Sequence, residues 1–92
     1  MWIDDLTENE REVLRTGEIE EEYTGAYGFS YEISVYNYAN ISTNKAKGAL
    51  SSLVKKGILN HRRFKEDGSW WNYYTVTDEE KVKDLRKYFG YE

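Results

Sequence analysis

The sequence predicts an α+β fold in which a small helical core carries one β-hairpin and a closing C-terminal helix. Residues 43–56 place apolar side chains at the spacing of an amphipathic helix. Residues 58–76 contain two runs rich in aromatic and β-branched residues around the turn sequence 66–69. Residues 77–80 have the pattern of a helix start. A chain of 92 residues has room for a single domain, 1–92, with one core.

The first helix is predicted over residues 8–22. Thr7 and Glu10 have the spacing of a capping box, in which each side chain accepts a hydrogen bond from the backbone N–H of the other residue. Gly17 interrupts the helical pattern and costs roughly 1 kcal/mol relative to alanine. It is therefore a point where the helix can kink or pause. A loop is predicted over residues 24–28.

The second helix is short, and the pattern that predicts it is ambiguous. Between residues 27 and 36 the apolar side chains fit both the alternation of a strand and the spacing of a helix. We interpret this segment as an extended piece near residues 28–30 followed by a helix over residues 31–39. Residues 40–42 form a tight turn, and Ser42 can cap the next helix.

The third helix is predicted over residues 43–56. Its apolar side chains recur at i, i+3, i+4, i+7 and i+8 and define the face toward the core, formed by Ala46, Ala49, Leu50, Leu53 and Val54. Lys55 and Lys56 suit the negative end of the helix dipole. Gly57 ends the helix in the left-handed conformation that glycine adopts without strain.

A hairpin and a last helix follow. The strands are predicted over residues 58–64 and 70–76, and the last helix over residues 78–89. Two helices joined by a turn of about three residues form a helix-turn-helix unit, and a hairpin directly after the second helix is a wing. The element order therefore predicts a winged helix-turn-helix, with a three-helix core, a β-hairpin wing and a C-terminal helix.

The aromatic residues of the returning strand divide into two pairs, because successive strand residues point to opposite faces. Trp70 and Tyr74 are expected to face the core together with Val76, while Trp71 and Tyr73 face outward. Cross-strand aromatic pairs stabilise a hairpin, so core packing and hairpin support are the expected roles of these side chains.

Charge is distributed unevenly along the chain, whose formal net charge is −4. Residues 1–32 carry ten acidic residues and two arginines, and residues 66–92 carry seven acidic and four basic residues. The 33 residues between them carry seven lysines and arginines and no acidic residue. Because the local field decides whether phosphates are attracted, this acid-free stretch predicts a surface that favours a polyanion despite the negative total.

Residues 40–59 read NISTNKAKGALSSLVKKGIL. This segment resembles the turn and recognition helix of bacterial and archaeal winged helix-turn-helix regulators, MarR-like proteins among them. In such families an aliphatic residue packs in the turn, a small residue and two leucines face the core, and Lys-Gly and two aliphatics lead into the wing; here these are Ile41, Ala46, Leu50, Leu53 and residues 56–59. Residues 74–79 are similar to the segment between the wing and the closing helix, so the resemblance spans residues 31–85.

The resemblance implies a transcriptional regulator that binds double-stranded DNA, with a recognition helix (about 43–56) in the major groove and a basic wing (about 58–76) on the backbone. The residues implied to contact DNA are Ser42, Thr43, Asn44, Lys45, Lys47, Gly48, Ser51, Lys55, Arg62, Arg63 and Lys65. Asn44 can pair with adenine, and lysine can donate to guanine. Arg62 and Arg63 point to opposite faces of a strand, so only one of them can face the duplex at a time.

Gly48 has two interpretations. On the outward face of the recognition helix, a missing side chain allows the DNA to approach closely. The alternative is a tight contact with another helix, or plain sequence drift with no role for the glycine. Either kind of contact would offset the roughly 1 kcal/mol that glycine costs in a helix relative to alanine.

An enzyme is not expected, because no nucleophile–base pair, metal cluster or phosphate loop is apparent. The one histidine, His61, gives little general-base capacity, and no cofactor or metal is expected. The chain has no cysteine, which fits a reducing cytoplasm. It has no apolar run of about 18 residues, so no membrane helix is expected either.

Two further expectations concern partners. A protein-interaction winged helix, such as an adaptor or a phage-type inhibitor, is the alternative function, and the acidic first helix with Glu18 and residues 20–22 supports it. A homodimer through the terminal helices is also expected, because several apolar residues near the ends are not needed by the predicted core: Trp2, Ile3, Leu6, Tyr88, Phe89 and Tyr91.

Overall fold

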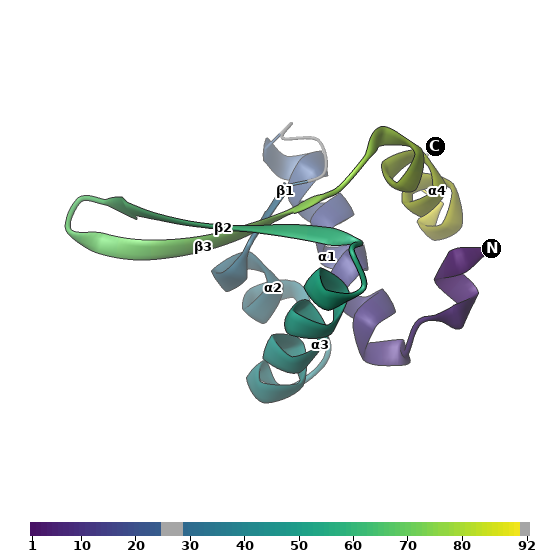
Figure 1. The fold of residues 1–92 in the computed structure, drawn as a ribbon, viewed down its shortest axis with the longest axis horizontal. Coiled ribbons are helices and arrows are strands. Elements are labelled where there is room, and N and C mark those ends of the chain that lie inside the picture. Colours follow the sequence, from purple (N-terminus) through teal and green to yellow (C-terminus); the bar gives the residue numbers. More distant parts are fainter. Residues whose placement is uncertain (25–28, 91–92) are drawn as a thin grey trace.

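The computed structural model describes residues 1–24 and 29–90, and the side chains of residues 1–17 and 32–90 (Figure 1). The elements are η1 (Trp2–Asp5), α1 (Glu8–Thr24), β1 (Phe29–Tyr31), α2 (Glu32–Tyr38), α3 (Thr43–Lys55), β2 (Leu59–Glu66), β3 (Ser69–Val76) and α4 (Glu79–Phe89). This is the α+β winged helix-turn-helix that the sequence predicts, with η1 as an unpredicted addition. Most of the loop predicted over residues 24–28 lies outside the described residues.

The first helix, α1, begins at the predicted capping box. The backbone N–H of Glu10 donates to the Thr7 hydroxyl at 3.1 Å, and the backbone N–H of Thr7 donates to the Glu10 carboxylate at 2.9 Å. The helix then continues through Gly17 to Thr24 without a break. A single glycine costs only roughly 1 kcal/mol, and the buried residues before it, Val13 and Leu14, hold this part of α1 in the core.

The third helix, α3, begins as predicted and ends at Lys55, one residue before the predicted end. Ser42 accepts a hydrogen bond from the backbone N–H of Lys45 and caps the helix. The predicted inward residues are buried, apart from the half-buried Val54. Gly57 follows the last turn with a φ of +74°, the left-handed conformation in which glycine is unstrained.

The hairpin belongs to a three-stranded antiparallel sheet with the strand order β1-β3-β2. Asp67 and Gly68 form its turn, with φ values of +51° and +80°, as a two-residue turn of type I′ requires. The short strand β1 pairs with the root of β3, where Phe29 lies opposite Thr75. The sequence predicted an extended piece near this position but not its partner.

The start of α4 differs from the prediction by one residue. Asp78, not Thr77, caps the helix by accepting from the backbone N–H of Lys81 at 2.8 Å. Thr77 instead closes the other end of the hairpin, because its hydroxyl donates to the carbonyl of Gly57 at 3.1 Å and its backbone N–H donates to the carbonyl of Ile58 at 3.0 Å. Thr77 thus ties the exit from α3 to the end of the wing.

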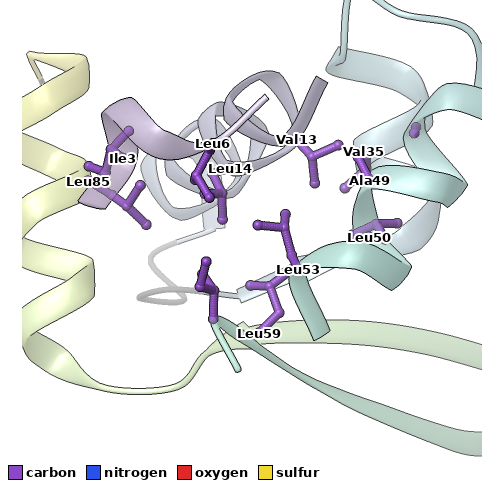
Figure 2. Packing of buried hydrophobic residues seen from close by; sticks show 12 residues of the cluster. Ile3, Leu6, Val13, Leu14, Val35, Ala49, Leu50, Leu53, Leu59 and Leu85 are labelled. Atoms are coloured by element: carbon purple, nitrogen blue, oxygen red, sulfur yellow. The ribbon is translucent and has the colours of Figure 1, made fainter. Parts of the chain in front are cut away.

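The core joins both ends of the chain to the helix-turn-helix (Figure 2). Ile3 and Leu6 from the N-terminal segment are buried with Leu85 of α4 and Leu53 of α3. Trp2 and Phe89 pack against this cluster, and the indole N–H of Trp2 donates to the carboxylate of Asp84 at 2.9 Å. The expectation that these terminal residues form a dimer contact is therefore wrong for Ile3 and Leu6, which the core of one chain already buries.

Within the described part of the chain, no helix is long and apolar enough to cross a membrane.

Candidate nucleic-acid interface

The outward face of α3 is exposed along its whole length. Its central line is formed by Asn44, Gly48, Ser51 and Lys55, which recur at i, i+4, i+7 and i+11 and lie opposite the buried leucines and alanines. All of the residues that the sequence assigns to DNA contact on this helix and its cap are exposed: Ser42, Thr43, Asn44, Lys45, Lys47, Gly48, Ser51 and Lys55. The structure thus brings these predicted residues together on one surface.

Two lysines stand on opposite flanks of this line. Lys47 leans toward α2, with its Nζ 6.0 Å from the ring centroid of Tyr36. Lys45 is on the side of α1 and borders an open groove of about 330 Å³ that Thr7 and Ser52 also line. A groove of DNA that received α3 would therefore meet a cation on each side of the helix.

Gly48 lies in open space. A methyl group built on its Cα would meet no atom within 4 Å beyond the backbone of its own helix and its chain neighbours. The tight helix–helix contact that was one interpretation of this glycine is therefore wrong. Close approach of DNA stays a prediction, and plain sequence drift stays its alternative.

Lys56 has a different role from the other cations of the acid-free stretch. Its Nζ donates to the Glu10 carboxylate at 2.8 Å, and the hydroxyl of Ser52 donates to the same carboxylate at 2.7 Å. Burial opposes the ionisation of Glu10, but the hydrogen bonds from Lys56, Thr7 and Ser52 outweigh it and lower the pKa of this carboxyl to about 2. A side chain of α1 that is charged at neutral pH therefore holds the C-terminal half of α3.

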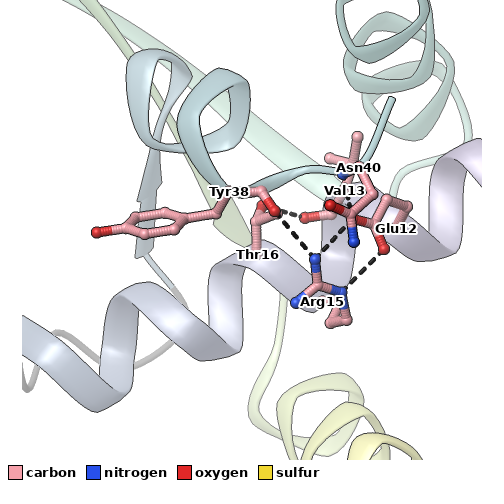
Figure 3. Close-up of polar contacts among 6 residues, drawn as sticks. All are labelled: Glu12, Val13, Arg15, Thr16, Tyr38 and Asn40. Carbon is pink, nitrogen blue, oxygen red and sulfur yellow. Dashed lines mark hydrogen bonds and ion pairs between the residues drawn. The ribbon is translucent and has the colours of Figure 1, made fainter. Parts of the chain in front are cut away.

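A second cluster from α1 holds the turn in front of α3 (Figure 3). The Arg15 guanidinium forms an ion pair with Glu12 at 2.6 Å and donates to the carbonyl of Tyr38, the last residue of α2, at 3.0 Å. Glu12 also accepts from the backbone N–H of Asn40 at 2.6 Å. The hydrogen bond from Arg15 lowers the pKa of Glu12. Polar side chains of α1 thus hold the turn before α3, through Tyr38 and Asn40, and the end of α3, through Ser52 and Lys56.

The wing has two faces, which the register between β2 and β3 defines. We call the inner face the one that bears Leu59 and Val76, which pack on the core. Directly paired residues of antiparallel strands share a face. The inner face therefore consists of Leu59, His61, Arg63, Lys65, Trp70, Asn72, Tyr74 and Val76, and the outer face consists of Asn60, Arg62, Phe64, Glu66, Ser69, Trp71, Tyr73 and Thr75.

Near the body of the protein, the inner face is partly covered: Asn72 and Tyr74 are half-buried, and His61 beside them is exposed. Tyr74 lies against the core and stacks on His61, with ring centroids 4.9 Å apart and an interplanar angle of 19°. Nε2 of His61 lies 2.8 Å from Oδ1 of Asn72. His61 thus supports the base of the wing.

Farther out, the same face is exposed. Trp70 lies on the predicted face with Tyr74 and Val76, but the indole is 58% exposed. The expectation that Trp70 packs inward is wrong, because the hairpin extends beyond the helices at this point (Figure 1). Its ring instead contacts two cations: the guanidinium carbon of Arg63 lies 4.8 Å and Nζ of Lys65 lies 6.0 Å from ring centroids of the indole.

The outer face carries the other arginine. Arg62 donates to the hydroxyl of Tyr73 at 3.0 Å, and Tyr73 makes an edge-on contact with Phe64 at 5.3 Å between centroids. The structure thus places Arg62 and Arg63 on opposite faces, as the sequence predicts.

Comparison with known proteins bears on the fold. The chain matches no protein-family model, and no curated protein matches its sequence. A solved structure, Stf76 from the Sulfolobus islandicus plasmid-virus pSSVx, is similar to it with a TM-score of 0.58 and 13% sequence identity. The similar region covers 90% of this chain and 97% of Stf76. The two proteins share a fold. At this identity the likeness supports the winged-helix architecture and carries no residue roles with it.

Sequence reasoning missed the roles of two residues: the buried Glu10, which holds α3 in position, and the exposed Trp70 on the wing. Glu10 was identified as a cap, but the sequence separation of 46 residues from Lys56 hides their contact. For Trp70 a signal did exist: the residue lies two positions after the turn glycine, near the tip of the hairpin, where little chain is left to cover it. No group of His, Asp or Glu side chains suited to hold a metal ion occurs among the residues that the structure describes.

Proposed function

We propose that this protein is a transcriptional regulator that binds double-stranded DNA, with α3 in the major groove and the wing on the sugar-phosphate backbone. The observation that carries the proposal is where the structure places the cations of the acid-free stretch, residues 33–65. This stretch folds into α2, α3 and most of β2, so that its cations lie on α3, at its end and on the two faces of the wing's first strand. Within the described part of the chain, Lys56 is the only one of its seven basic residues that forms an ion pair with a carboxylate.

On α3, charge and hydrogen-bonding groups have separate roles in this proposal. Lys45, Lys47 and Lys55 neutralise phosphates, and the N-terminal N–H groups of the helix with the hydroxyls of Ser42 and Thr43 bind a further phosphate. The exposed amide of Asn44 reads a base edge, for which adenine is the matching partner. Gly48 and Ser51 leave room for the groove along the centre of the helix.

On the wing, Lys65 and one arginine of the pair Arg62 and Arg63 contact the backbone. Such contacts position the protein without reading sequence. A regulator of this kind would act in the cytoplasm of a prokaryotic cell, where the DNA is. It would bind as a homodimer that places two recognition helices about one helical turn of DNA apart.

The test is binding to random-sequence duplex DNA, measured by fluorescence anisotropy over a series of salt concentrations. The wild-type protein should bind with a log–log slope of about −0.9 for each phosphate neutralised. The double variant Lys45→Glu, Lys47→Glu should lose binding. The matched control is Lys83→Glu, Lys87→Glu, which makes the same change in net charge at exposed positions of α4 and should bind nearly as the wild type does.

Absence of binding at low salt by a folded wild-type sample would contradict the proposal, because every such regulator binds DNA non-specifically to some extent. An equal loss in both double variants would also contradict it, since net charge and not the surface of α3 would then decide binding. Absence of binding would favour the alternative, a winged helix that contacts a protein through the acidic first helix. The side chains of Glu18 and residues 20–22, on which that alternative depends, lie outside the described residues.

A further inference from the structure

The distal part of the inner wing face carries a compact group of three side chains: Arg63, Lys65 and Trp70. Lys65 and Trp70 are direct cross-strand partners, and Arg63 lies diagonally across from the indole on the same face. Both cations contact the ring, at 4.8 Å for Arg63 and 6.0 Å for Lys65. Such contacts are weak at exposed sites, and the indole keeps 58% of its surface exposed. The core therefore does not account for a tryptophan at this position.

The distribution of charged residues on the inner wing face indicates which kind of partner it can bind. Between residues 59 and 76 the strands contain one carboxylate, Glu66, and the register places it on the outer face. The inner face bears Arg63 and Lys65 and no carboxylate. An exposed aromatic ring between two cations, with no carboxylate on its face, is complementary to a polyanion that also has apolar surface. The sugar-phosphate backbone of a duplex has both.

The direction of the face agrees with this partner. Figure 1 shows α2 and α3 on one side of the hairpin, and the inner face is the side that packs toward the core. A duplex that reached the wing from the side on which α2 and α3 lie would therefore meet the inner face. Arg62 and Trp71 point away from it, and Arg62 already donates to the hydroxyl of Tyr73.

We propose that Arg63, Lys65 and Trp70 form the duplex-binding site of the wing, in which the two cations contact neighbouring phosphates and the exposed indole packs on the deoxyribose between them. The inference rests on the proposed function and deepens it, because it assigns one face and one arginine. The ring also limits the freedom of the two long side chains before binding, so less entropy is lost when they meet phosphate. Arg62 and Trp71 make no contact with the duplex.

The adjacent pairs on opposite faces provide matched variants. Arg63→Gln should reduce the magnitude of the log–log salt slope by about 0.9, because one phosphate contact is lost. Trp70→Ala should weaken binding about fivefold or more across the salt series, the effect of losing an aromatic contact at the centre of a site. Arg62→Gln and Trp71→Ala should bind within about twofold of the wild type. Equal losses on both faces, or losses on the outer face alone, would overturn the assignment.

Tryptophan fluorescence provides a second readout that does not depend on an alanine variant folding. The conservative variants Trp71→Phe and Trp70→Phe each keep Trp2, so they differ only in which wing indole remains. Saturating duplex should change the emission of Trp71→Phe, which retains Trp70, and leave that of Trp70→Phe nearly unchanged. The opposite pattern would overturn the proposal. A change seen with single-stranded but not duplex DNA would also overturn it, because the ring would then stack on bases.

The proposed function and the assignment of the wing face can fail separately. If the wild type binds no duplex, the proposed function fails and the wing assignment fails with it. If the wild type binds and Lys45→Glu, Lys47→Glu does not, but the variants of the two wing faces behave alike, the function stands and the assignment to the inner face is wrong.

Discussion

Glu10 of α1 and Lys56 at the end of α3 form an ion pair across the helix-turn-helix, with 2.8 Å between Oε1 and Nζ, although Glu10 is only 1% exposed. The same carboxylate completes the capping box with Thr7 and accepts from Ser52. One side chain therefore caps α1 and fixes the position of α3 on it. This couples the stability of α1 to the orientation of the proposed DNA-binding surface.

We expect Glu10→Ala to lower the free energy of unfolding by about 2–3 kcal/mol. The variant loses the cap, worth about 1 kcal/mol, and the hydrogen bonds of a buried carboxylate. Lys56 is half-exposed and can turn to water, which keeps the loss below that of a fully buried pair. Urea unfolding measures the change. Glu8→Ala is the control, because Glu8 is exposed in the same turn and its removal should cost less than about 0.5 kcal/mol. Equal unfolding midpoints for the two variants would contradict this account.

The low pKa of Glu10 predicts how stability depends on pH. Its folded-state pKa of about 2 lies below the ordinary value of 4.5. The stabilisation is therefore fully present above about pH 4.5 and is lost as the pH falls toward 2. The difference corresponds to roughly 3 kcal/mol. In thermal unfolding from about pH 6 to about pH 2, the gap between wild type and Glu10→Gln should close in this window. Glu12, whose pKa is also lowered, is present in both proteins and cancels. A gap that stays constant with pH would show that Glu10 does not titrate as described.

Local sequence patterns predicted the helices and strands. The features that they did not predict depend on contacts between residues far apart in the chain. The capping box of Thr7, the cap at Ser42 and the left-handed Gly57 depend on neighbours within a few residues, and all three are confirmed. The burial of Ile3 depends on α4, which lies some 80 residues later in the chain, so the pattern near the N-terminus could not reveal it.

The same division applies to the candidate site. Helical periodicity alone was enough to place the predicted residues of α3 on one exposed surface. Strand alternation was enough to separate Arg62 from Arg63. Alternation could not show how far the core extends beneath the wing. It therefore placed Trp70 on the correct face but predicted burial for a side chain that is exposed.

Replacement of Gly48 by alanine should separate stability from binding. The space around its Cα is open, so Gly48→Ala should stabilise the protein by roughly 0.5–1 kcal/mol through the helix propensity of alanine. If DNA approaches the centre of α3 closely, the added methyl should weaken duplex binding severalfold. Gly17→Ala in α1 is the control, because it also has open space and should stabilise the protein without affecting binding. Unchanged binding in Gly48→Ala would contradict close approach at this residue.

A homodimer through the terminal segments cannot use Ile3 and Leu6, because the core of one chain already buries them, but α4 offers an exposed aromatic residue. Tyr88 is 42% exposed and contacts Phe89 edge-on at 5.1 Å. Both border an open cleft of about 370 Å³ with Ile41, next to the turn that precedes α3.

We therefore expect the wild type to sediment as a dimer and Tyr88→Glu to sediment as a monomer, because the substitution places a charge in the apolar contact. Ile33→Glu changes an apolar residue that is 53% exposed on α2 and should leave the dimer intact. Analytical ultracentrifugation of the three proteins without DNA distinguishes these outcomes. A monomeric wild type would show that terminal residues serve only the core, and a half-site arrangement would then require the DNA itself to bring two copies together.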